Sequence, residues 1–174
     1  MTRRTTTGWM TALGLSLILA LTGCGSDDAP ETPKPKTTAD AAVADKAAVL
    51  DAFSRFWAES VVIANSGKVP KDALQTNATG SLREQELAQL NEDAKRGTTR
   101  TGAPKFKDQT VTLSGDTALV VTCVNTDEWV FVLKDGRKLA GKAGWRQLGR
   151  ELTKVDGKWL VTGSSPASTK DTCP

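Results

Sequence analysis

The hydrophobic pattern changes its period once along the chain, and this change constrains the fold more than any other feature. In residues 39–64 apolar side chains recur every three or four positions, with Leu50, Phe53 and Trp57 on one stripe. That spacing is typical of a helix with one or more buried faces. From residue 106 onward, apolar and polar residues alternate or form short apolar runs, which indicates strands. A helical part followed by a strand-rich part predicts an α+β fold, with the helices packed on one face of a curved antiparallel sheet.

Capping and turn residues place the element boundaries. Asn65-Ser66-Gly67 ends the long helix, and Pro70 can open a short helix over residues 71–75. Ser81-Leu82-Arg83-Glu84 fits a capping box that starts a third helix, which Gly97 ends. The expected strands are 106–113, 117–124, 129–133, 145–155 and 158–162, joined as an antiparallel meander with hairpin turns at Asp135-Gly136 and Asp156-Gly157.

The amino-terminal segment has the organisation of an export signal. Arg3 and Arg4 precede Trp9–Leu21, an uncharged apolar run that is shorter than the about 20 residues a membrane-spanning helix needs. The run ends in Leu21-Thr22-Gly23-Cys24, which resembles a bacterial lipobox. The resemblance implies that residues 1–23 are a signal peptide, cleaved before Cys24, and that Cys24 carries diacylglycerol on its sulfur. The alternatives are an ordinary secretory signal with a chance cysteine and a short uncleaved anchor.

The segment after Cys24 reads as a spacer. Residues 25–40 contain Pro30, Pro33 and Pro35, mixed charges and no large apolar side chain. Such a segment cannot bury enough surface to fold, and its prolines favour an extended chain. We therefore expect residues 24–44 to be a flexible linker and residues 45–174 to form the α+β domain.

Composition excludes several classes of site. Arg3 and Arg4 are the only charged residues before Cys24, so without them the net charge of +3 falls to +1. A nearly neutral mature chain does not favour a nucleic-acid partner. The chain has no His and no Tyr. A Ser-His-Asp or Cys-His catalytic site therefore cannot exist, and we expect no catalytic constellation, no metal site and no cofactor.

Two cysteines remain once Cys24 carries a lipid. Cys123 lies in the apolar strand expected at 117–124, and Cys173 lies one residue from the end. An exported chain enters an oxidising compartment. We predict a Cys123–Cys173 disulfide that ties the tail to the sheet, with two free thiols as the alternative.

Several short motifs together resemble a known group of proteins. They are Asp51-Ala52-Phe53-Ser54-Arg55-Phe56-Trp57, Ala78-Thr79-Gly80-Ser81-Leu82, Gly115-Asp116-Thr117-Ala118-Leu119-Val120-Val121-Thr122-Cys123-Val124, Asp156-Gly157-Lys158-Trp159-Leu160-Val161 and the terminal Cys173. In this order they are similar to secreted actinobacterial lipoproteins with a nuclear transport factor two-like domain, also called ketosteroid isomerase-like or cystatin-like. The resemblance implies a cone-shaped sheet around the first helix, with an apolar pocket at its wide end.

Four tryptophans are candidates for lining that pocket, because aromatic side chains dominate ligand sites. They are Trp57, Trp129, Trp145 and Trp159. All four lie in helix or strand patterns, so packing in the core is the competing interpretation. Enzymes of the family use a pocket carboxylate as base and a Tyr or protonated acid as oxyanion donor. No Asp or Glu of this chain matches the base position by its motif.

The pattern of charged residues is more typical of solvent-exposed surfaces than of binding or catalytic sites. A local basic excess surrounds one hairpin and comprises Lys134, Arg137, Lys138, Lys142, Arg146 and Arg150. It could meet anionic headgroups or wall polymers, but a solvated hairpin face is the favoured interpretation. Asp51, Arg55 and Glu59 are spaced for ion pairs along one helix edge. Asp127 and Glu128 are expected in a turn.

Together these features predict a lipid-anchored, non-catalytic binding or interaction module on the outer face of the bacterial plasma membrane. Its expected partners are the membrane, through the lipid anchor, and either an apolar small molecule or an envelope protein. One alternative is an isomerase- or cyclase-type enzyme of the same fold, which needs a buried carboxylate facing the pocket. Another is a structural accessory that forms a homodimer through the outer face of the sheet.

Overall fold

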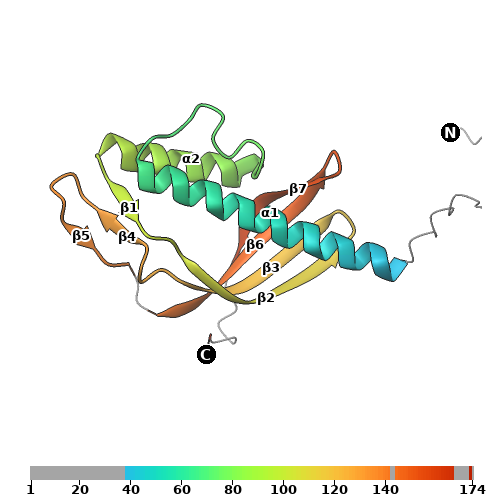
Figure 1. The fold of residues 1–174 in the computed structure, drawn as a ribbon. Coiled ribbons are helices and arrows are strands. Elements are labelled where there is room, and N and C mark those ends of the chain that lie inside the picture. Colours follow the sequence, from blue (N-terminus) through green and yellow to red (C-terminus); the bar gives the residue numbers. More distant parts are fainter. Residues whose placement is uncertain (1–37, 142–143, 167–172, 174) are drawn as a thin grey trace, which may run out of the picture. The chain divides into compact units, whose positions relative to one another are not determined.

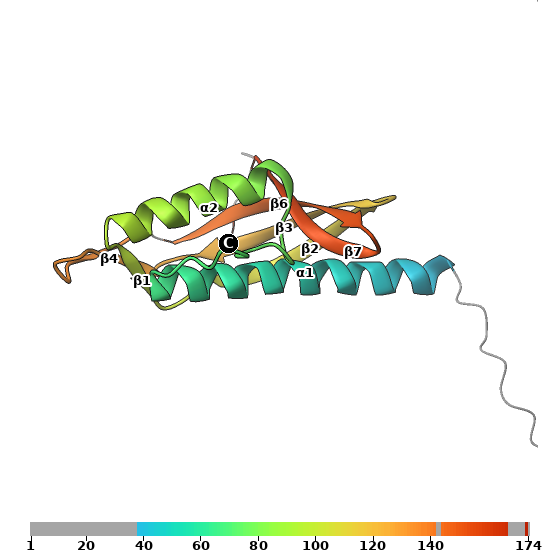
Figure 2. The same cartoon turned by 90° about the horizontal axis from the view of Figure 1, so that it is seen from above.

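A long helix crosses one face of an antiparallel sheet in the computed structural model, which describes residues 38–141, 144–166 and 173. In chain order the elements are α1 (Thr38–Ser66), α2 (Gly80–Lys95), β1 (Thr99–Thr101), β2 (Lys105–Ser114), β3 (Thr117–Asn125), β4 (Val130–Val132), β5 (Lys138–Leu139), β6 (Trp145–Val155) and β7 (Lys158–Ser165). Figures 1 and 2 show α1 and α2 over the same face of the long strands. The predicted α+β class is confirmed. None of the helices in the described ranges has the length and apolar character that a membrane span requires.

The strands form two sheets, not one continuous meander. The larger sheet has the order β2-β3-β6-β7 and the smaller has the order β1-β4-β5, with every pairing antiparallel. The sequence patterns missed β1 and β5, which have three and two residues. Because β4 leaves the larger sheet to pair with β1, β3 pairs directly with β6, and the predicted meander is wrong at this step. The β4–β5 hairpin and β1 project beyond one end of the larger sheet (Figure 1).

The core lies between the buried face of α1 and the larger sheet. Val49, Phe53 and Phe56 of α1 are at most 1% exposed, and they share one cluster with Val120 and Leu152 of the sheet. Burying one such side chain completely contributes roughly 1.5–3 kcal/mol. Residues 36–174 thereby form a compact unit with its own core, which is the condition for folding independently of the segment before it.

The connection between α1 and α2 contains turns where a short helix was expected at 71–75. Leu74 is fully buried and has a φ of +60°. A positive φ is incompatible with a continuing right-handed helix. The Glu59 carboxylate accepts hydrogen bonds from the Leu74 backbone N–H, at 2.7 Å, and from the Asn77 side chain, at 2.6 Å. A side chain from α1 thus satisfies backbone polarity that a helix would have satisfied internally.

The predicted capping box also proved wrong. Thr79, not Ser81, is the N-cap residue of α2, and its side chain makes no capping hydrogen bond.

The hairpin turns were predicted correctly. Asp156 and Gly157 have φ values of 49° and 76°, as the two central residues of a type I′ turn require.

The predicted disulfide is present. Cys123 of β3 is bonded to Cys173, with 5.7 Å between the two Cα atoms and a sequence separation of 50. Cys123 points away from the face that carries Val124, because successive strand residues alternate between faces. Cys24 and the predicted signal and spacer up to residue 37 lie outside the described residues, and α1 already begins at Thr38, inside the range 24–44 expected as linker.

Candidate functional site

A cavity of about 440 Å³ lies beside the end of the larger sheet that meets β1 and β4. Its lining comes from α1, β1, β3, β4, β6 and the adjoining loops, and consists of Trp57, Arg100, Val124, Thr126, Trp129, Phe131, Gly141, Arg146, Leu148 and Arg150. We call it the arginine cavity, because its three charged lining residues are all arginines. Its volume lies in the range of sites that hold small molecules.

Strand alternation brings two of these arginines to the helix-covered face. Arg146, Leu148 and Arg150 are spaced by two in β6, so their side chains share one face. In the register of the sheet, Arg146 lies opposite Val124 and Arg150 opposite Val120, both buried. The third arginine comes from the smaller sheet, where Arg100 lies opposite Phe131.

Arg150 is a buried cation at the inner wall. It is only 8% exposed. One Nη donates to the Ser164 hydroxyl at 2.7 Å, and the other lies 3.6 Å from a Glu86 carboxylate oxygen. Its guanidinium carbon is 5.5 Å from the centre of the Trp57 ring, and its Nε has no hydrogen-bond partner in the described part of the chain. Burial lowers the pKa of Arg150, and the charge of Glu86 acts in the opposite direction.

Arg100 is held between two aromatic rings. Its guanidinium carbon lies 4.0 Å from the ring centres of both Trp129 and Phe131, a cation–π arrangement that suits the flat arginine head. Its Nε is buried, and within the described ranges it has no hydrogen-bond partner. Burial lowers the pKa of Arg100, and the charges of Asp93 and Glu86 raise it. Arginine nonetheless stays protonated in proteins.

Arg146 is the most exposed of the three arginines that line the cavity. One of its Nη atoms donates to the Thr126 hydroxyl at 3.0 Å. Among the described residues, the three arginines form one ion pair, between Arg150 and Glu86. Three cations and one close carboxylate make the cavity electropositive.

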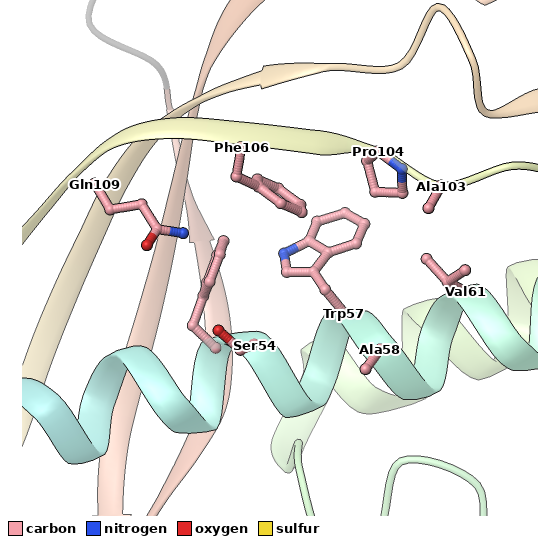
Figure 3. A pocket seen from close by; sticks show the side chains of 9 residues that line it. Ser54, Trp57, Ala58, Val61, Ala103, Pro104, Phe106 and Gln109 are labelled. Carbon is pink, nitrogen blue, oxygen red and sulfur yellow. The ribbon is translucent and has the colours of Figure 1, made fainter.

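A second, apolar cavity of about 240 Å³ lies on another side of Trp57. Figure 3 shows Trp57 rising from α1 toward Phe106 and Pro104, with Gln109 farther along the strand. The Trp57 and Phe106 ring centres are 5.2 Å apart. Trp57 therefore lines both cavities, and its indole N–H is buried without a partner in the described chain.

The four candidate tryptophans divide into two pairs. Trp57 and Trp129 line the arginine cavity, with ring centres 6.1 Å apart. The prediction has to be corrected for the other two. The Lys107 ammonium covers the Trp145 ring at 4.6 Å, and Trp159 is 3% exposed within the core, so neither lines either cavity. Alternation places Trp145 on the opposite face of β6 from Arg146, which explains the difference.

The predicted basic face also divides. Lys134, Arg137 and Lys138 are exposed on the β4–β5 hairpin, as expected, whereas Lys142 lies outside the described residues. For Arg150 the expectation of a solvated face is wrong, because β6 turns this side chain inward. The period of two from Arg146 through Leu148 to Arg150 was the available signal. Arg100 was missed, since a three-residue strand has no pattern of its own.

The carboxylates that the sequence offered as candidates do not line the arginine cavity or the apolar cavity. Asp51 forms an ion pair with Arg55, whereas Glu59 holds the chain before α2 instead of pairing along the helix edge. Asp127 and Glu128 lie in the loop after β3, as predicted. Neither the arginine cavity nor the apolar cavity is lined by any of these carboxylates or by Glu151. In the described ranges no group of three or more Asp, Glu, Cys or His residues could hold a metal ion.

Comparisons with known proteins return similarities of fold at low identity. No family model and no curated protein sequence matches the chain. The intermembrane-space region of the chloroplast protein ARC6 is 15% identical over 77% of this chain and 100% of its own, with a TM-score of 0.48. Kfla4162 from Kribbella flavida is 14% identical over 74% of this chain and 95% of its own, with a TM-score of 0.48. An NTF2-like protein with a cystatin-like fold from Novosphingobium aromaticivorans is 15% identical over 72% of this chain and 85% of its own, with a TM-score of 0.41.

Proposed function

We propose that the protein is a lipid-anchored, non-catalytic binding module of the bacterial cell envelope, which holds a small molecule in the arginine cavity. The observation that carries the proposal is the cavity itself, whose aromatic and aliphatic walls surround a few convergent polar groups. This combination is the usual composition of a small-molecule site. The lipobox at residues 21–24 and the proline-containing spacer support the location at the outer face of the plasma membrane.

The anchor is tested by changing Cys24. We expect Cys24→Ala to abolish labelling by a radioactive or clickable fatty acid and to move the protein from the membrane fraction to the soluble fraction. The reason is that two acyl chains give stable anchoring, whereas a chain without them has no comparable hold on the bilayer. Cys173→Ala is the matched control, because it also removes a cysteine but should leave labelling intact. A Cys24→Ala protein that stays labelled and membrane-bound would refute the anchor.

The binding function is tested by native mass spectrometry of residues 36–174, produced by export so that the disulfide forms. We expect a fraction of the protein to carry one small molecule from its host, which denaturation releases. Val124→Phe should abolish this mass by filling the cavity, because Val124 is buried in its wall. Val121→Phe is the matched control, since it adds the same ring on the other face of β3.

Absence of any retained mass, together with no binding from a metabolite library, would contradict the binding function and favour the alternatives. An isomerase-type enzyme needs a carboxylate base at the cavity. In the described chain, Glu86 is the carboxylate within 4 Å of a cavity arginine, and it is paired with Arg150. No specific observation favours a homodimer through the outer sheet face, so the binding module remains the function that the site supports best.

A further inference from the structure

We propose that the ligand of the arginine cavity is an amphiphilic anion: a carboxylate or phosphate group joined to a flat apolar body. The inference rests on the proposed binding function and narrows it from a small molecule to one chemical class. It changes the expectation of an apolar ligand, because the apolar walls are only part of the cavity. The positive charges at the wall decide the class.

The charge balance of the cavity is the first argument. Arg100, Arg146 and Arg150 line it, and among the described residues Glu86, 3.6 Å from Arg150, is the one carboxylate in ion-pair contact with them. Asp93 acts on Arg100 without forming such a pair. Removing a cation from water is costly unless a counter-charge or hydrogen bonds replace the lost hydration. Arg150 is 8% exposed and Arg100 is half-buried. A bound oxyanion would supply the missing counter-charge.

Three neighbouring carboxylates have hydrogen-bond or ion-pair partners outside the cavity. The Asp93 carboxylate accepts a hydrogen bond from Gln89, and Glu128 is paired with Lys105 on the protein surface. Asp127 accepts hydrogen bonds from Asn125 and from the backbone N–H of Gly144. Asp93 and Glu86 still act on Arg100 through their charge, but within the described ranges only Glu86 forms an ion pair with a cavity arginine. The cavity therefore keeps an excess of positive charge.

The orientation of the donors is the second argument. Trp129 and Phe131 lie against Arg100 and hold its planar head, which leaves the N–H groups at its edge as the groups that can contact a ligand. The described residues supply no acceptor for its Nε. A guanidinium presents its donors in a fork that matches a carboxylate or a phosphate. A preorganised arginine of this kind binds an oxyanion at a low entropic cost.

The apolar lining selects the remainder of the ligand. Trp57, Val124 and Leu148 line the same cavity and carry no charge. The indole of Trp57 contributes a flat apolar surface to the wall. A small inorganic anion would leave this surface uncovered, whereas an aromatic or other flat apolar body would bury it.

The experiment is a titration of residues 36–174 with three matched probes, followed by isothermal calorimetry and tryptophan fluorescence. The probes are 2-naphthoate, 2-naphthyl phosphate and the neutral 2-naphthalenemethanol. We expect at least one anion to bind about tenfold or more tightly than the alcohol, because hydrogen bonds to charged groups are the stronger ones. Its affinity should fall as salt is raised, whereas that of the alcohol should not. The anion that binds more tightly shows whether the ligand carries a carboxylate or a phosphate group.

Variants tie the binding to the cavity. Arg100→Gln and Arg150→Gln should each weaken the preferred anion about tenfold while leaving the alcohol unchanged. Glu86→Gln should strengthen it, because this change removes the competing negative charge beside Arg150. Arg137→Gln is the matched control, since it removes the same group from the exposed hairpin and should change nothing. Circular dichroism and the melting temperature check that each variant is folded, and Arg100→Gln serves if Arg150→Gln does not fold.

Equal or tighter binding of the alcohol, or anion binding that Arg100→Gln and Glu86→Gln leave unchanged, would overturn the inference but leave the binding function standing. Binding of an anion that responds to Arg137→Gln instead would place the site on the hairpin and also overturn it. If none of the probes binds and the natively purified protein is also empty, the proposed function itself fails. The two failures are therefore distinguishable.

Discussion

Gly102→Ala is expected to destabilise the folded domain by roughly 4 kcal/mol, the sum of backbone strain and steric overlap. Gly102 has a φ of +83°, a conformation that side chains disfavour. A Cβ built there would lie 1.9 Å from the backbone oxygen of Glu128, so one of the two segments must move. Neither can move cheaply, because the contact is with backbone and not with the end of a flexible side chain.

The same junction positions one wall of the arginine cavity. The Asn65 side-chain amide donates to the Gly102 carbonyl oxygen at 2.8 Å, and the Asn65 amide oxygen accepts the Trp129 indole N–H at 3.2 Å. Displacing Gly102 or Glu128 would therefore shift Trp129, which covers one side of Arg100. We expect the Gly102→Ala protein to lose ligand affinity as well as stability.

Urea unfolding of residues 36–174, followed by circular dichroism, measures the effect. Gly115→Ala is the matched control, since Gly115 has a φ of +58° but no atom lies within 4 Å of its added Cβ. It should cost about 1 kcal/mol from conformation alone. Equal losses for the two variants would show that the steric overlap at Gly102 is relieved without cost.

Removing the disulfide is the second large effect. The double variant Cys123→Ala, Cys173→Ala is expected to lose roughly 4 kcal/mol, because the bond closes a loop of 50 residues in the unfolded chain. Cys123 is also buried, so the replacement leaves some lost packing as well. The melting temperature and the urea midpoint of residues 36–174 should both fall.

A reducing agent separates the bond from the side chains. Dithiothreitol should lower the stability of the wild-type domain nearly to that of the double variant, and should have no effect on the double variant itself. Arg137→Gln serves as the reference, because it keeps both cysteines and should lose as much stability in dithiothreitol as the wild-type domain does. Two alkylatable thiols in the native, exported protein would contradict the bond, and stability that dithiothreitol does not change would contradict its contribution.

The structure confirmed those predictions that rest on interactions between residues close together in the sequence. The stripe through Leu50, Phe53 and Trp57 became α1, and Gly97 ended α2 as expected, with a φ of +66°. The Asp156-Gly157 turn formed because both residues tolerate a positive φ. Among the long strands, β6 was correct to the residue at both ends, whereas β2, β3 and β7 extend one to three residues beyond their predicted bounds.

The signals that failed depend on partners distant in sequence. The short helix expected at 71–75 is replaced by a turn. Glu59 of α1 stabilises this turn by accepting a hydrogen bond from Leu74, which is 15 positions later in the sequence. The capping box did not form because α2 begins two residues earlier than it implies, at Gly80 with Thr79 as the N-cap. β1 and β5 exist only through their pairing with β4, and nothing in their own residues predicts that partner.

The sequence by itself determined the class of fold, the pairing of Cys123 with Cys173, and the absence of histidine and tyrosine chemistry. These follow from composition and from periods that local sterics impose. Only the tertiary structure decided that Arg150 points inward, that Arg100 joins it from another sheet, and that Trp129 lies over Arg100 while Trp145 does not. The physical reason is that a site is assembled by contacts between distant segments, whose free energy depends on sheet register and burial and not on neighbouring residues.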